Sequence, residues 1–335
     1  MSTLLKTEHL TSSNGTMAAA VLVEPGRIEI EDVAIPAPGP GQVRIALEGC
    51  GVCASNLPPW EGRPWFKYPF APGQMGHEGW GVIDAIGSGV EKFKEGDRVA
   101  ALSENAYAQY DVSLADCVVK LPSKLDGQAF PGEPLSCAMN IFGRSGAQGA
   151  KTVAIVGIGF LGSLLTRLAS KANGASVIAI SRRGFSLDMA KAMGAAHVIP
   201  MDDHWKIIER VKELTGGKMC DVVIEAVGKQ WPLDLAGELT AERGRLVVAG
   251  YHQDGPRQVN MQLWNWRGLD VINAHERDPK VYVDGMMRAV EAVVAGDLDL
   301  APLLTHDFAL EQLSSALTAT AQREGNFMKA LVKMA

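Results

Sequence analysis

The sequence predicts an α/β fold in which an all-β, barrel-like unit is followed by a doubly wound parallel sheet. From residue 17 to about 137, short apolar runs are separated by Gly and Pro, a pattern typical of short strands joined by turns. From about 138 to 270, apolar runs alternate with helical segments, which indicates βαβ units and a parallel sheet. A chain of 335 residues also has the length of two domains.

Four apolar runs mark the expected strands of the first unit: AAAVLVEPG (18–26), QVRIALEG (42–49), GWGVIDAIGSGV (79–90) and DRVAAL (97–102). The stretch IPAPGPGQ (35–42) cannot be helical, because each Pro removes a backbone donor and restricts the residue before it. We therefore expect extended strands joined by turns throughout this region.

The second region reads as alternating strands and helices. Strands buried on both faces appear as continuous apolar runs, and such runs occupy 152–157, 176–181, 196–200, 221–228, 245–250 and 269–274. Helices are expected between them at 161–171, 187–193, 204–214 and 231–239, and in the C-terminal part near 283–295 and 310–321.

Composition excludes several classes of protein. A net charge of −6 gives no basic surface for nucleic acid, and 47% hydrophobic residues is too apolar for a disordered chain. The charge-free stretch 152–166 is too short for a membrane span, and residues 1–16 form a polar extension without a signal-type apolar core. Five sparse cysteines indicate a reducing compartment, so we expect a cytoplasmic protein without nucleic-acid or membrane partners.

A glycine loop stands between the first expected strand and helix of the second region. Gly157, Gly159 and Gly162 form G-x-G-x-x-G, with Phe160 and Leu161 inside the motif. In this strand–helix context the motif predicts a Rossmann dinucleotide site, with pyrophosphate at the helix N-terminus. Val227 and Gly250, near the ends of two later strands, complete the predicted cofactor-binding residues.

The end of the next strand indicates which dinucleotide binds. NAD sites usually place Asp or Glu there for the ribose 2′-hydroxyl. This chain has Ser181, Arg182 and Arg183 instead, so no carboxylate repels a 2′-phosphate and two guanidinium groups can bind one. We predict NADP(H) in preference to NAD(H), the alternative being that the arginines form only a solvated turn.

Four residues of metal-ligand type lie in three separate stretches: Cys53, the pair His77 and Glu78, and Cys137. Their spacing alone does not define a zinc site. A buried Cys is commonly a small hydrophobic residue, and a His beside a Glu can be a structural hydrogen bond.

The chain from residue 17 onward resembles the medium-chain, zinc-dependent alcohol and polyol dehydrogenases. The motifs occur in family order: AAVLVEPG, PAPGPGQV, GVCASN, GHEGWGVIDAIGSGVEKFKEGDRV, EPLSC, VGIGFLG and GYHQDG. The resemblance implies a GroES-like catalytic domain of residues 17–137 and 271–335, with a Rossmann domain of residues 138–270 inserted between its parts.

The resemblance also implies roles for individual residues. It makes Cys53 and His77 zinc ligands, and Cys137 lies where many members have a third ligand. Glu78 is a direct ligand in some members and supports the ligands in others. Glu133 matches a residue that holds the water on zinc in polyol-type members. Ser55 would accept the hydroxyl proton of the substrate and pass it through the cofactor ribose toward solvent.

Three departures from the family pattern stand out. The cysteine-rich lobe that holds a structural zinc is missing, so one catalytic zinc is expected. Asn56 replaces the Asp that orients the histidine ligand in relatives, which predicts weaker support for that ligand. Pro58 replaces a His often used in proton relay, so that route is closed.

The sequence thus predicts a zinc-dependent enzyme that interconverts a small alcohol, of the secondary-alcohol, polyol or sugar-derived class, and its carbonyl by hydride transfer with NADP(H). Two alternatives are a zinc-free NADPH quinone or enone reductase of the same superfamily and a non-enzymatic nucleotide-binding protein. The family further implies a homodimer or homotetramer, often joined through the last Rossmann strand, here the apolar run 269–274.

Overall fold

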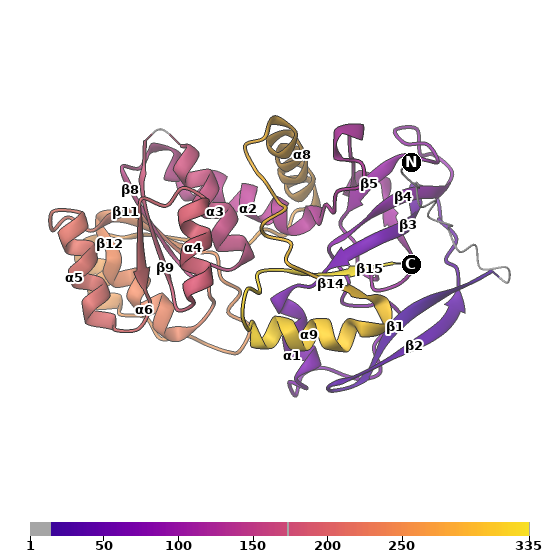
Figure 1. Ribbon diagram of the computed structural model, residues 1–335, viewed down its shortest axis with the longest axis horizontal. Coiled ribbons are helices and arrows are strands. Elements are labelled where there is room, and N and C mark those ends of the chain that lie inside the picture. Colours follow the sequence, from indigo (N-terminus) through magenta and orange to yellow (C-terminus); the bar gives the residue numbers. More distant parts are fainter. Residues whose placement is uncertain (1–14, 173, 335) are drawn as a thin grey trace, which may run out of the picture. The chain divides into compact units, whose positions relative to one another are not determined.

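The computed structural model describes residues 15–172 and 174–334. Of the predicted N-terminal extension, all but residues 15 and 16 lies outside this range, and Thr16 begins the first strand. The chain divides into two compact units (Figure 1). The first contains residues up to Pro131, His306–Gln322 and the chain from Ala330 on, and the second contains Gly132–Thr305 and Arg323–Lys329.

The first unit is mainly β. Its strands are β1 (Thr16–Glu24), β2 (Arg27–Ala34), β3 (Gln42–Gly51), β4 (Gly79–Ile86), β5 (Arg98–Ala101), β6 (Tyr110–Leu114), β7 (Val118–Lys120), β14 (His306–Ala309) and β15 (Ala330–Lys333). Its helices and 3₁₀ turns are η1 (Ala54–Asn56), α1 (Leu57–Trp60), η2 (Ala115–Cys117), η3 (Ser123–Leu125), η5 (Leu310–Gln312) and α9 (Leu313–Gln322).

The main sheet of this unit has the order β14-β15-β3-β4-β5-β7, and β6 also pairs with β3. β15, from the end of the chain, pairs antiparallel with β3 and parallel with β14. The C-terminal segment therefore completes a sheet that begins near the N-terminus. β1 and β2 form a separate antiparallel hairpin.

The second unit contains a parallel sheet. Its strands are β8 (Thr152–Val156), β9 (Ser176–Ser181), β10 (His197–Pro200), β11 (Cys220–Glu225), β12 (Thr240–Val248) and β13 (Asp270–Asn273). Its helices are α2 (Gly132–Ser145), α3 (Phe160–Lys171), α4 (Gly184–Ala192), α5 (His204–Leu214), α6 (Gln230–Leu239), α7 (Met261–Arg267) and α8 (Pro279–Ala295), with the turn η4 (Ala147–Gly149). The order β10-β9-β8-β11-β12-β13 is the 3-2-1-4-5-6 order of a doubly wound dinucleotide-binding fold.

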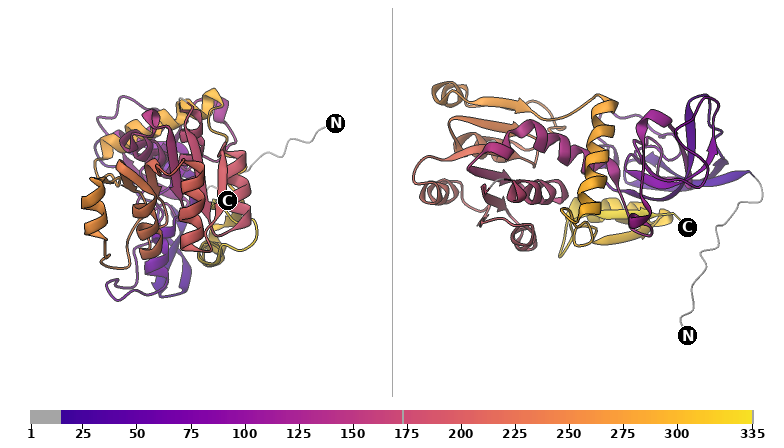
Figure 2. Two further views of the ribbon diagram at one scale, coloured as in Figure 1. Left: turned by 90° about the vertical axis from the view of Figure 1, so that its left-hand side faces the viewer. Right: turned by 90° about the horizontal axis from the view of Figure 1, so that it is seen from above.

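Helices cover both faces of the parallel sheet (Figures 1 and 2). Alternate residues of each central strand enter different cores. On β9, Ile178 and Ile180 pack with residues of α5 and α6, whereas Val177 and Ala179 pack with residues of α3 and α4. Burial on both faces explains why these strands read as continuous apolar runs.

Most expected elements of the second region are present, with shifted ends. The helix expected at 204–214 is α5, and the strand expected at 245–250 begins earlier, at Thr240. Two helices were not anticipated, α2 and α7. Within the described residues, no helix is long and apolar enough to cross a membrane.

The division into units differs from the predicted domain boundaries. Residues 132–137 and 271–305, assigned above to the catalytic domain, lie in the second unit. The physical reason is packing: β13 adds to the parallel sheet beside β12, and α8 packs on α2. The segment Arg323–Lys329 also belongs to the second unit, although α9 and β15 on either side of it belong to the first.

Candidate active site

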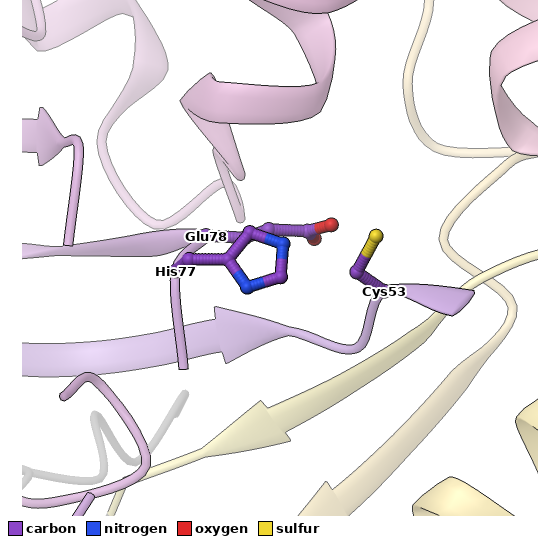
Figure 3. A group of neighbouring side chains, drawn as sticks. All are labelled: Cys53, His77 and Glu78. Atoms are coloured by element: carbon purple, nitrogen blue, oxygen red, sulfur yellow. The ribbon is translucent and has the colours of Figure 1, made fainter. Parts of the chain in front are cut away.

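Three of the predicted metal ligands come together in the first unit. β3 and β4 are antiparallel, with Cys50 opposite Gly79, so the end of β3 lies beside the start of β4. This register brings Cys53 next to His77 and Glu78, whose ligand atoms all lie within 4.8 Å of one another. Figure 3 shows the three side chains pointing toward a common point.

His77 is oriented by a backbone carbonyl. Its Nδ1 lies 2.8 Å from the carbonyl oxygen of Met75. Met75 has φ +83°, in the left-handed region that non-glycine residues seldom adopt. With Nδ1 directed at this oxygen, Nδ1 carries the proton and Nε2 is left as the nitrogen for a metal.

Asn56 joins the two loops that carry the candidate ligands. It is 3% exposed, and its Nδ2 donates to the same Met75 carbonyl at 2.9 Å. Its Oδ1 accepts from the backbone N–H of Cys53 at 3.2 Å and from the hydroxyl of Tyr107 at 2.9 Å. Support for the histidine thus passes through a shared carbonyl, a route that the sequence did not reveal.

Cys53 caps the short turn η1. Its Sγ accepts the backbone N–H of Ser55 at 3.5 Å, which places a donor against the sulfur. Glu78 is fully buried, whereas Cys53 and His77 are half-buried. A thiol, an imidazole and a carboxylate directed to one point are donors that Zn²⁺ accepts, so these residues fit the ion that the sequence predicts.

Cys137 and Glu133 lie in the second unit, one turn apart on α2. The Cys137 thiol lies 3.2 Å from Oε1 of Glu133, so the two side chains share a face of the helix. The Tyr282 hydroxyl lies 3.9 Å from Cys137 Sγ, and it donates to the Glu276 carbonyl at 3.2 Å. Burial, with the charges of Cys137 and Glu133, raises the pKa of Tyr282 far above its usual value, so it stays a neutral donor.

The glycine loop has the geometry that the motif requires. Gly157 has φ +101° and forms the turn after β8. A Cβ on Gly162 would lie 2.0 Å from the Gly157 carbonyl, so this glycine allows α3 to pack closely. A Cβ on Gly159 would meet no heavy atom within 4 Å, which leaves the backbone there open to a ligand.

The two arginines after β9 differ in their surroundings. Ser181 is buried and Arg182 is exposed. Arg183 Nη1 donates to the carbonyl oxygens of Phe327 and Arg323, at 2.6 and 3.2 Å. Burial, and then the positive charge of Arg323 nearby, lower the pKa of Arg183. Arg323 is therefore a further cation close to this strand end.

Lys329 is a further cation that the sequence analysis missed. It is 5% exposed, and its Nζ lies 5.1 Å from the ring centroid of Phe160. Phe160 is the first residue of α3, whose N-terminus is the expected pyrophosphate site. The available signal was a lone Lys in the apolar run FMKALV.

A barrel-like unit that carries a thiol–imidazole–carboxylate cluster, joined to a dinucleotide-type parallel sheet, is characteristic of two-domain dehydrogenases that use a metal. Comparison with known proteins agrees. Residues 39–128 match the model of the alcohol dehydrogenase GroES-like domain, and residues 161–291 match that of the zinc-binding dehydrogenases.

Curated relatives and solved structures extend this match over nearly the whole chain. Sorbitol dehydrogenase of Bacillus subtilis (strain 168) is 27% identical, over 94% of this chain and 97% of the relative. (R,R)-butanediol dehydrogenase of Neisseria gonorrhoeae is 28% identical, over 89% of this chain and 94% of the relative. The crystal structure of 2R,3R-butanediol dehydrogenase from Bacillus subtilis shares the fold, with a TM-score of 0.81 and 24% identity. The match covers 95% of this chain and 99% of that structure. The chain belongs to the family of medium-chain, zinc-dependent alcohol and polyol dehydrogenases.

Proposed function

We propose that this protein interconverts a secondary alcohol or polyol and its carbonyl compound, using one zinc ion and NADP(H). The observation that carries the proposal is the convergence of Cys53, His77 and Glu78 in a chain of this family. The curated relatives named above act on sorbitol and butanediol, which supports a small hydroxylated substrate.

The chain's own residues would divide the chemistry as follows. When bound, zinc supplies Lewis acidity at the substrate oxygen, and the nicotinamide exchanges the hydride. Cys53, His77 and Glu78 would hold the ion, with His77 aligned by the Met75 carbonyl. Ser55 would accept the hydroxyl proton of the alcohol. Its backbone is fixed by the bond from its N–H to Cys53 Sγ.

For Cys137 and Glu133 we propose the roles that the resemblance implies: Cys137 as the alternative to Glu78 in completing the zinc ligands, and Glu133 as the residue that holds the water on zinc. Their contact on α2 supports a joint role, because replacing either side chain changes the environment of the other. We propose the NADP(H) preference on the absence of an acidic residue after β9 and on the cations at that strand end, Arg182, Arg183 and Arg323.

Zinc content tests the metal part of this proposal. Protein purified without added metal should contain about one zinc per chain, as a single catalytic site requires. Cys53→Ala should lose the metal, whereas Cys117→Ala, a matched change at a half-buried cysteine outside the cluster, should keep it. Cys137→Ala and Glu133→Gln then show which of the two side chains helps to hold the ion.

The zinc-free reductase is not favoured, because the donor set is intact and the curated relatives named above are sorbitol and butanediol dehydrogenases. Freshly prepared protein without zinc that reduces quinones would reverse this preference. A protein that binds zinc and NADPH but turns over no alcohol or carbonyl would instead support the non-enzymatic alternative.

We further propose that the chain forms a homodimer or homotetramer through β13. Within the described residues, this strand ends the parallel sheet and pairs only with β12. Unpaired strand edges favour association with another strand, and large apolar side chains are exposed on and near β13.

A further inference from the structure

Glu225, a carboxylate outside the predicted site, is fully buried at the end of β11. Its Oε1 accepts the backbone N–H groups of Val227 and Gly228, both at 2.7 Å. Its Oε2 lies 3.0 Å from Nε2 of His252. A buried carboxylate is costly unless such bonds satisfy it, so the loop after β11 is folded around this group.

The protonation state of His252 follows from its second neighbour. Arg257 Nε donates to His252 Nδ1 at 2.9 Å. An arginine can only donate, so Nδ1 is an acceptor and Nε2 carries the proton directed at Glu225. The ring is therefore neutral and held in one tautomer, with a defined hydrogen bond on each side.

Arg257 is itself fixed by several partners. Its Nη2 donates to the Gly228 carbonyl at 2.9 Å and also contacts Asp254. Lys229 binds the other oxygen of Asp254 at 2.5 Å. Lys229 and Arg257 hold the pKa of Asp254 well below its usual range, so the carboxylate stays charged near neutrality.

This network controls where the loop after β11 lies. A Cβ on Gly157, the first glycine of the glycine loop, would lie 2.4 Å from Val227 Cγ2, so the two loops are in close contact. A Cβ on Gly250 would lie 2.2 Å from the Gly228 nitrogen. Small displacements of residues 226–228 would therefore also shift the glycine loop, which they contact at Gly157.

The network lies in a specific half of the nucleotide-binding fold. The strand order reverses between β8 and β11, and a dinucleotide binds outside the carboxyl ends of the strands at such a point. The adenosine ribose is read after β9, where Arg182 stands. The end of β11 therefore belongs to the other mononucleotide half, which takes the nicotinamide.

We propose that Glu225, His252 and Arg257 are positioning residues for the nicotinamide half of the cofactor. They hold residues 226–228 in the conformation that receives this half. They neither transfer a proton nor contact the 2′-phosphate. The inference rests on the proposed function, because it requires that the protein bind NADP(H).

Two ligands separate a positioning role from a general structural one. NADPH spans both halves of the site, whereas adenosine 2′,5′-bisphosphate occupies only the adenosine half. His252→Ala should raise the Kd of NADPH about tenfold, the effect of losing one hydrogen bond to a charged group. The Kd of the bisphosphate should change by less than about twofold. Both are measured by calorimetry on the full chain.

Conservative variants sharpen the test. His252→Gln keeps an N–H donor near the position of Nε2, so NADPH affinity should stay within about threefold of wild type. Glu225→Gln places an amide N–H₂ against the His252 N–H or the loop N–H groups and should be at least as damaging as His252→Ala. His204→Ala is the matched control, because His204 also pairs with a glutamate, Glu238, at 3.6 Å, outside this network.

The outcomes are distinct. Equal weakening of both ligands with a lower melting temperature would show a purely structural role and overturn the inference. Unchanged NADPH affinity in His252→Ala and Glu225→Gln would also overturn it, with the proposed function left standing. Wild-type protein that binds neither NADPH nor NADH would overturn the proposed function, and this inference with it.

Discussion

Asn56 stands where the resemblance implies an Asp, and its hydrogen bonds explain why an amide suits this position. Its Nδ2 faces the Met75 carbonyl, which also accepts His77 Nδ1. Its Oδ1 faces two donors, the Cys53 N–H and the Tyr107 hydroxyl. Only a side chain with one donor and one acceptor group satisfies all of these partners at a buried position.

Asn56→Asp should therefore weaken metal binding even though it restores the family residue. A carboxylate oxygen would face the Met75 carbonyl, so two acceptors would meet without a donor between them. A buried polar group left without a hydrogen-bond partner lowers the free energy of unfolding by about 1–3 kcal/mol. We expect reduced zinc content and a lower melting temperature, measured by metal analysis and thermal unfolding. Asn265→Asp, at an exposed position of α7, is the control. Wild-type zinc content in Asn56→Asp would contradict this account.

Arg182 and Arg183 should contribute differently to cofactor preference. Arg182→Ala should reduce the preference for NADPH over NADH about tenfold, because it removes charge-assisted bonds without disturbing the fold. Arg183→Ala should also lower the melting temperature, since its guanidinium group binds two carbonyls of the segment Arg323–Lys329. Fluorescence titration with both nucleotides tests this, with Arg210→Ala on α5 as the control. NADH preference in the wild type would show that these arginines do not select a 2′-phosphate.

Among the elements, the glycine loop and α3 offer a test that separates folding from binding. Gly162→Ala forces a Cβ to within 2.0 Å of the Gly157 carbonyl, so α3 must shift and the unfolding midpoint should fall. Gly159→Ala meets no atom within 4 Å and should fold normally. Its methyl group would nevertheless occupy space that a pyrophosphate needs, so NADPH affinity should fall at least tenfold. A Gly159→Ala variant with full affinity would place the pyrophosphate elsewhere.

The loop before β5 shows how an ion pair gives stability that depends on pH. Asp97 is 6% exposed and binds Lys120 Nζ at 2.6 Å. That bond, with the backbone N–H of Lys94, lowers its pKa from 3.8. Because the folded pKa is the lower one, the stabilisation is complete above about pH 4 and is lost as the pH falls through the folded pKa.

Asp97→Asn should lower stability by about 1 kcal/mol at pH 7, a modest effect because the Lys120 end is exposed. The difference from wild type should shrink below about pH 4. This stability difference is measured from the urea midpoints of both proteins, at pH 7 and at the lowest pH where the wild type stays folded. Asp116→Asn, in the exposed pair with Lys92, should change almost nothing at either pH. A loss that does not depend on pH would point to packing instead.

Helices, strands and loops that are marked by a short-range sequence pattern could be predicted from the sequence. The glycine motif, the apolar strands and the amphipathic helix His204–Leu214 depend on short-range patterns, and all are present. The register that joins Cys53 to His77, and the support that Asn56 gives through Met75, depend on residues about 20 positions apart. A sequence pattern does not encode such contacts, although the motifs of the family singled out Cys53, His77 and Glu78 as candidate ligands.

The contacts of Glu225 were equally hidden from sequence analysis. A lone acidic residue ending the apolar run DVVIE was visible, but its partner His252 follows a different strand. The division into two units differs from the predicted domain bounds for a similar reason. Strand β13 and helix α8 join the second unit through pairing with β12 and packing on α2, which are tertiary properties.

At the scale of the whole molecule, the exposed edge of the parallel sheet bears on assembly. Among the described residues, β13 has a neighbouring strand on one side only. Val271 on this strand is 38% exposed, and the nearby Trp266 and Met261 on α7 are 87% and 60% exposed. Exposed apolar side chains beside an unpaired strand edge are uncommon in monomers and typical of an interface between copies of a chain.

We therefore expect the wild-type protein to be a dimer or tetramer at micromolar concentration in multi-angle light scattering. Val271→Lys combined with Trp266→Lys should shift it toward the monomer, because charges on the strand edge and the apolar surface oppose pairing. Trp205→Lys, at an exposed tryptophan of α5, should leave the assembly unchanged. NADPH binding by the separated subunits would show that the parallel sheet folds without its neighbour. A wild-type monomer would instead mean that this edge stays uncovered and that the strand is protected only by its short length, four residues.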